Sequence, residues 1–186
     1  MKNRKIIFLV VLLLALGYYT FRSQPSSKPG IGDTELRSQT KAEKKRLGIL
    51  WNYSTSSDPM GGTIKNAYIL SLNEINFQFP YQGSQRATLT LRNHPRYGKD
   101  VILGLNKGQF LCGYPKCQVT VRFDNGKPQK YSAAEPADHS TNTLFINGYA
   151  KFLENLKKSK KLYIEAIFYQ EGSKVFEFDI EDLAWD

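Results

Sequence analysis

Two cysteines and two histidines are the side chains of this 186-residue chain best suited to covalent or metal chemistry. Cys112 and Cys117 are the only cysteines, and Gly, Tyr, Pro and Lys separate them. A redox pair of the thioredoxin type would have two intervening residues, and a zinc site would need further cysteine or histidine ligands nearby. In an exported protein, such a pair around a Gly- and Pro-containing hairpin is typical of a structural disulfide. We therefore predict a Cys112–Cys117 disulfide, with a reactive or unpaired state as the alternative, and no metal or cofactor.

Neither histidine lies in a recognisable catalytic motif. His139 belongs to Asp138-His139-Ser140, which contains the residue types of a nucleophilic triad, but neighbours in sequence seldom reach triad geometry. No serine lies in a strand–turn–helix elbow, and nothing at a motif spacing supplies an oxyanion hole. We expect an exposed loop and no catalytic residue. A small exported hydrolase that uses His139 or His94 is the alternative.

The turn-rich stretch 92–98 is the candidate binding loop. Its exposed basic and aromatic residues are Arg92, His94, Arg96 and Tyr97. Two interpretations are open, a loop that faces a ligand and an ordinary solvated turn, and the turn chemistry favours the second. Arg92 and Arg122 each lie at a predicted strand end, where we expect structural ion pairing with Asp100 or Asp124, and a polar recognition pair is the alternative.

Short segments of alternating apolar and polar residues, separated by Gly, Asn, Asp or Pro, predict ten strands. The predicted strands are 67–72, 75–79, 87–91, 101–105, 109–112, 118–123, 129–133, 143–146, 162–169 and 174–180. Residues 124–127 contain Asn-Gly and predict a tight hairpin, and residues 170–173 predict a second one between the last two strands.

One helix interrupts this pattern. Tyr149, Phe152, Leu153 and Leu156 recur at helical spacing, and Asn147 is the expected N-cap. Many short strands with a single helix exclude a doubly wound α/β protein. The predicted fold is mainly β, an antiparallel β-sandwich or small open barrel with one helix in its C-terminal half. An α+β arrangement with a single larger sheet is the alternative.

The N-terminal residues 1–21 have the pattern of a membrane anchor. Sixteen residues without a charge, from Ile6 to Phe21, follow the basic residues Lys2, Arg4 and Lys5. This order predicts a transmembrane helix in the inner membrane, with the N-terminus in the cytoplasm and the rest in the periplasm or outside the cell. Cleavage after Gly17, as a signal peptide, is the alternative.

Residues 22–46 predict a flexible basic tether with a short helical turn over 39–46, and residues 47–186 predict one globular domain. Of the net charge of +9, three charges precede residue 22, four lie in 22–47, and only two lie in 48–186. The nearly neutral domain argues against nucleic-acid binding. The basic tether is suited to anionic lipid headgroups or to plain solvation.

Trp51, then Asp58-Pro59-Met60, a strand ending in Arg92 and the segment 121–126 follow one another in an order that resembles small bacterial envelope proteins. These include TagO-like accessory proteins of type VI secretion and invasion-associated locus B-like proteins. The resemblance implies a small exported β domain and no site residue. Together, these features predict a membrane-anchored envelope protein whose domain binds an envelope protein partner without catalysis.

Overall fold

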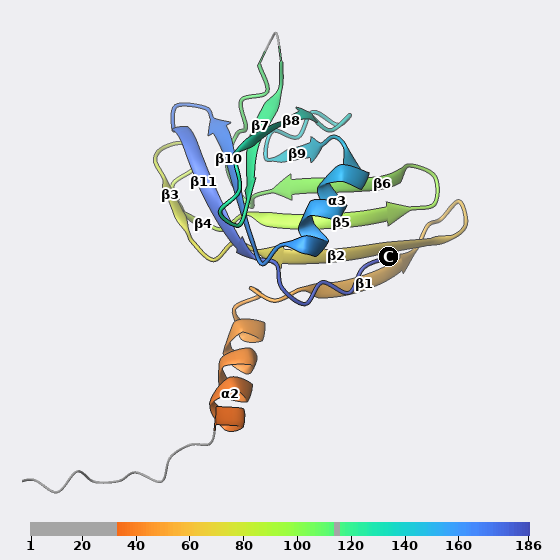
Figure 1. Ribbon diagram of the computed structural model, residues 1–186. Helices are drawn as coiled ribbons and strands as arrows, with labels where there is room; N and C mark the ends of the chain where they lie inside the picture. Colours follow the sequence, from red (N-terminus) through yellow and green to blue (C-terminus); the bar gives the residue numbers. More distant parts are fainter. Residues whose placement is uncertain (1–32, 114–115) are drawn as a thin grey trace, which may run out of the picture. The chain divides into compact units, whose positions relative to one another are not determined.

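The computed structural model describes residues 33–113 and 116–186, with side chains from residue 40 onward (Figure 1). Residues 39–186 form one compact unit. The predicted anchor from Ile6 to Phe21 lies outside the described residues. In the part that is described, no helix combines the length and the apolar character needed to cross a membrane.

Helix α2 (Asp33–Arg46) is longer than the helical turn expected within the tether. The segment contains neither Gly nor Pro and is rich in Lys, Glu, Gln and Arg, which are good helix formers. Its C-terminal end joins the domain, because Lys44 forms an ion pair of 2.7 Å with Asp179 and the N–H of Ile49 bonds the carbonyl of Lys44. The helix therefore includes the helical turn expected over 39–46 and begins six residues before it.

Eleven strands follow in the described residues. They are β1 (Asn52–Ser57), β2 (Thr63–Leu70), β3 (Ile75–Phe77), β4 (Gly83–Gln85), β5 (Thr88–His94), β6 (Gly98–Gly104), β7 (Gln118–Phe123), β8 (Gln129–Ala134), β9 (Thr143–Ile146), β10 (Lys161–Phe168) and β11 (Gly172–Asp179). Nine of them form one sheet in the order β1-β2-β5-β6-β9-β8-β7-β10-β11, and β3 pairs with β4. Every strand pairing is antiparallel.

This single large sheet matches the alternative architecture rather than two packed sheets. Buried residues of β2, β5 and β6 belong to the same hydrophobic cluster as those of β7, β10 and β11. The sheet therefore bends around one core, and Figure 1 shows β10 and β11 crossing the direction of β2 and β5. The N–H of Leu72, just after β2, donates to the carbonyl of Glu177 in β11 at 2.6 Å, but the described strands do not close into a barrel.

The strand predictions fail where alternation is weak. The polar edge strand β1 and the short β4 were missed, since their side chains are mostly exposed and show no apolar period. Segment 109–112 is not a strand, and only an isolated bridge joins Phe110 to Phe168. Strands β2, β5 and β6 extend past the predicted ends by polar residues, which becomes important for the site.

Helix α3 (Tyr149–Lys158) confirms the predicted helix and buries Phe152 and Leu156. Its N-cap is Gly148, in the left-handed conformation, and not Asn147. Asn147 instead donates from its backbone and side chain to Ser132. A glycine is suited to this position because the chain must turn sharply between β9 and the helix.

The two predicted hairpins both join consecutive strands. The turn after β10 has positive φ angles at Gln170 and Gly172, and the last registered pair is Phe168 with Gly172. The β7–β8 connection is wider than the expected tight turn, because registered pairing stops at Val121 and Gln129.

Asp124 explains the wider connection. Its carboxylate accepts hydrogen bonds from the N–H groups of Lys160 and Lys161, at 3.0 and 2.8 Å, and so ties this turn to the start of β10. Arg122 does not pair with Asp124 as expected, and its guanidinium stacks 3.9 Å from the ring centroid of Tyr163.

Candidate functional site

Cys112 and Cys117 form a disulfide with a Cα–Cα distance of 4.4 Å, which confirms the predicted pairing. Disulfides persist in oxidising compartments, so this bond is typical of a protein outside the cytoplasm. In the described part of the chain, no group of three or more His, Cys, Asp or Glu side chains is placed to hold a metal ion.

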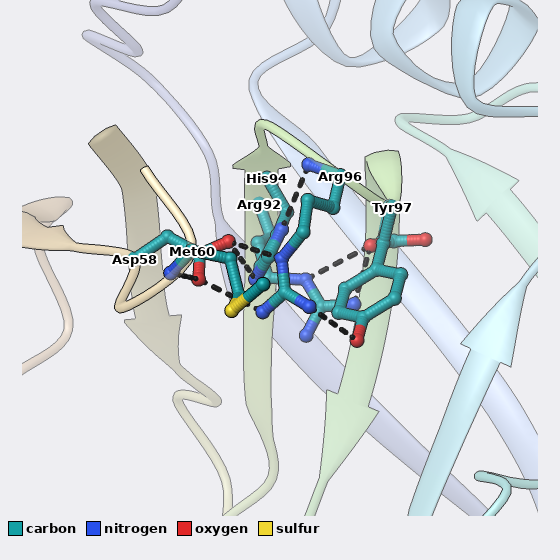
Figure 2. Close-up of polar contacts among 7 residues, drawn as sticks. Asp58, Met60, Arg92, His94, Arg96 and Tyr97 are labelled. Atoms are coloured by element: carbon teal, nitrogen blue, oxygen red, sulfur yellow. Dashed lines mark hydrogen bonds and ion pairs between the residues drawn. The ribbon is translucent and has the colours of Figure 1, made fainter. Parts of the chain in front are cut away.

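The predicted binding loop meets the β1–β2 loop through a buried carboxylate (Figure 2). The side chain of Asp58 is 0% exposed and accepts two hydrogen bonds from the Arg96 guanidinium, at 2.6 and 2.8 Å. It also accepts the backbone N–H of Met60 at 2.9 Å. The Arg96 hydrogen bonds, followed by the Met60 N–H, hold the pKa of Asp58 below its ordinary value.

His94 lies against this pair and is buried, with 7% of its surface exposed. Its Nδ1 accepts the N–H of Arg96 at 3.2 Å, so a neutral ring carries its proton on Nε2, which lies 3.7 Å from the Asp58 carboxylate. The ring also stacks on Tyr97, with centroids 4.4 Å apart. The expectation of a solvated turn is wrong for His94, because Arg96 and Asp58 fold the loop over the ring.

Arg92 has a separate partner on the neighbouring strand. It forms the predicted ion pair with Asp100, at 2.6 Å, and its guanidinium lies 5.4 Å from the ring centroid of Phe145. The structure thus brings the four predicted loop residues to one end of β5. Both arginines, however, form ion pairs with carboxylates of the same domain, Arg92 with Asp100 and Arg96 with Asp58. Tyr97 is the most exposed of the four, at 65%, and the paired Arg96 side chain is 43% exposed.

His139 lies apart from this cluster, in an exposed loop with a φ of 59°. Its neighbour Asp138 accepts the N–H of Ser140 at 3.0 Å, and the hydrogen bonds from Ser140 lower the pKa of Asp138. This carboxylate is therefore engaged in a local turn, which agrees with the exposed loop expected here.

A second site, not predicted, lies on the inner face of the sheet. Along β1, β2, β5 and β6 the inward-facing positions in register carry a row of residues that reaches the core, Tyr53, Ala67, Leu91 and Val101. Two residues further toward the loops, the same face carries Thr55, Lys65, Asn93 and Lys99, which we call the polar row. The row lies beyond the edge of the core, with Thr55, Lys65 and Lys99 exposed and Asn93 half-buried, and it lines a surface pocket of about 350 Å³.

The C-terminal residues Ala184–Asp186 form a wall of this pocket, beside β1 and β2 (Figure 1). Two tyrosine hydroxyls hold the wall in place. Tyr53 accepts the N–H of Ala184 at 2.8 Å, and Tyr149, the first residue of α3, accepts the indole N–H of Trp185 at 2.6 Å. Partial burial raises the pKa of Tyr149, so its hydroxyl stays protonated well above neutral pH.

The cations of the pocket lack carboxylate partners. Among the residues that the structure describes, neither Lys65 nor Lys99 forms an ion pair. Lys99 lies 5.9 Å from the ring centroid of Tyr149, and Asp186 is the acidic residue of the lining. This contrasts with Arg92 and Arg96, which are both neutralised.

Sequence reasoning missed the polar row because it ended the strands at their apolar residues. The alternation within each strand was nevertheless readable: Lys65 precedes Ala67 by two residues and Asn93 follows Leu91 by two, so each polar residue shares the face of the apolar residue on its own strand. Without the register between strands, however, nothing in the sequence places Lys65 beside Asn93 and Lys99.

Comparison with known proteins yields one loose likeness. No family model matches the chain, and no curated protein matches it. The crystal structure of invasion associated protein B from Bartonella henselae is similar over 70% of this chain and 88% of its own, at 11% sequence identity and a TM-score of 0.39. This degree of likeness assigns neither a family nor a site.

Proposed function

We propose that this chain is a membrane-anchored protein of the cell envelope whose domain, residues 47–186, binds a ligand or partner outside the cytoplasm without transforming it. The polar pocket is the observation that carries this proposal. A row of Thr, Lys and Asn continues the core face of the sheet beyond the apolar residues and lines a surface pocket, and a concave site with a few convergent polar groups is where a ligand is expected to bind.

The chemistry of the lining favours holding a ligand. Thr55 and Asn93 offer hydrogen-bond donors and acceptors, Lys65 and Lys99 offer charge, and Trp185 adds an aromatic wall. The strands provide a rigid floor, since all four polar-row positions lie in regular antiparallel ladders. The disulfide agrees with an exported domain, and the anchor from Ile6 to Phe21 would hold the domain at the membrane surface.

Binding to the full chain in detergent should be tested against a panel of monosaccharides, their uronates and phosphates, and short peptides. We expect saturable chemical-shift changes for at least one compound, and loss of these changes in Asn93→Leu, which removes the central amide of the pocket lining. The matched control is Asn125→Leu in the exposed β7–β8 turn. Both variants are first compared with wild type by thermal unfolding.

The bound compound is then recovered and its mass measured. An unchanged mass is expected, whereas conversion to a product would overturn the non-enzymatic part of the proposal. If no compound binds saturably, or if Asn93→Leu has no effect on any that does, the pocket is not the binding site.

A further inference from the structure

The geometry points to an anionic saccharide unit, a sugar carrying a carboxylate or phosphate group, as the ligand of the polar pocket. This inference rests on the proposed binding function and names its ligand class.

The two lysines are placed to share one anion. In the sheet register Lys65 pairs with Asn93, and Asn93 pairs with Lys99, so the lysines flank the asparagine on one face. Adjacent strands lie about 4.8 Å apart, which puts the two Cα atoms roughly 10 Å apart, within the reach of two flexible side chains toward one central group. Neither lysine forms an ion pair with a carboxylate in the described residues, although Asp186 lines the same pocket, so a bound anion would add a favourable interaction with both cations.

The remaining lining fits the rest of a sugar. Thr55 and Asn93 present a hydroxyl and an amide, which can both donate to and accept from sugar hydroxyls. The indole N–H of Trp185 is already bonded to Tyr149, so its ring is the part left for a ligand. An aromatic ring packs against the apolar C–H face of a sugar, and a volume of about 350 Å³ suits one or two sugar units.

Asp186 lines the same pocket and provides an internal test of the sign of the ligand charge. Its carboxylate competes with a bound anion for the two lysines. Asp186→Asn should therefore strengthen the binding of an anionic ligand and weaken or leave unchanged the binding of a neutral or cationic one.

Calorimetric titration of the full chain uses four probes: glucuronate, glucose 6-phosphate, glucose and inorganic phosphate. We expect the two charged sugars to bind at least about tenfold more tightly than glucose or phosphate, and to weaken as salt is raised. In Lys65→Gln/Lys99→Gln the charged sugars should lose about tenfold in affinity. The control Lys127→Gln/Lys157→Gln, which removes two exposed lysines elsewhere, should bind as wild type.

Each other outcome contradicts the inference in a distinct way. Phosphate as tight as glucose 6-phosphate would show an anion site without sugar recognition. An equal loss of affinity in Lys65→Gln/Lys99→Gln and in the control Lys127→Gln/Lys157→Gln would show that the charged sugars are attracted non-specifically to the surface charge. If a neutral probe binds and Asn93→Leu abolishes it, the binding function stands and the anionic ligand is wrong. If none of the four probes binds, the anionic-saccharide inference fails, and the binding function fails with it only if no compound of the wider panel, peptides included, binds either.

Discussion

At the scale of single residues, the buried carboxylate of Asp58 is the main polar anchor of the two hairpin loops. It receives the Arg96 guanidinium across 38 residues of sequence and keeps His94 between the loops. The strands that these loops connect are β1, β2, β5 and β6, which carry the polar row. The predicted binding loop and the β1–β2 loop are thus tied together at the end of the strands that line the pocket.

Replacing Asp58 by Asn should destabilise the fold in a pH-dependent way. Because the folded-state pKa of Asp58 is lowered, its ionised form stabilises the native state above the unfolded pKa of about 3.9, and this contribution is lost as the pH falls through the folded value. The urea midpoint of the variant should therefore be lower than that of wild type at pH 7. The difference between the urea midpoints of wild type and Asp58→Asn should become smaller as the pH is lowered toward about 2.

The control for this series is Glu135→Gln, a substitution of an exposed loop carboxylate that should leave the midpoint unchanged at pH 7. A pH-independent gap between wild type and Asp58→Asn would show that the side chain contributes by its shape alone.

The disulfide closes a loop of six residues, from Cys112 to Cys117. For a loop of this length the chain-entropy model gives about 2 kcal/mol, so Cys112→Ser/Cys117→Ser should lower the free energy of unfolding by roughly this amount. Mass spectrometry of the exported protein with and without reduction checks the bond itself. Two free thiols on fresh protein would contradict the pairing.

At the scale of elements, the start of helix α3 depends on Gly148. This residue has a φ of 85°, and a Cβ built there meets no atom within 4 Å. A side chain at this position would therefore meet no steric clash, and it would destabilise the fold only through the unfavourable left-handed backbone conformation. Phe152 and Leu156 depend on this turn, because it sets the angle at which the helix enters the core.

Gly148→Ala should reduce the free energy of unfolding by about 1–2 kcal/mol, the cost of holding an L-residue in the left-handed region. Gly148→Asn should cost less, since Asn tolerates this conformation better. Gly113→Ala is the control, because Gly113 has an open Cβ position without a positive φ. Equal stabilities of the Ala and Asn variants, measured by urea unfolding, would argue against this explanation.

At the scale of the whole molecule, the net charge is distributed unevenly between two parts of the chain. The domain is nearly neutral, whereas the excess of basic residues lies before it. In the proposed function, the anchor and tether set the location of the protein and the domain provides the binding site. The end of α2 connects them through Lys44 and Asp179 at the tip of β11.

Deleting the segment from Ile6 to Phe21 should move the protein from the membrane fraction to the soluble fraction, because no other apolar run of that length exists in the sequence. Fractionation and immunoblotting measure this change. N-terminal sequencing of the mature protein supplies the control: a start near Met1 agrees with an anchor, and a start at Tyr18 would show a cleaved signal peptide. A deletion variant that remained in the membrane would contradict the prediction.

The sequence by itself determined the mainly β character, the C-terminal-half helix and the disulfide, since each depends on local periodicity or on a single possible pair of cysteines. Three features were decided by tertiary structure alone: the single bent sheet, the burial of His94, and the polar row. The path of strand pairing from β6 through β9 and β8 to β7 depends on long-range registers that no local pattern encodes. Asp58 and Arg96 are far apart in the chain, as are Lys65 and Lys99, and the sheet order brings the first two into contact and the second two to one pocket. Local chemistry therefore predicted the elements, whereas non-local pairing decided which side chains share a site.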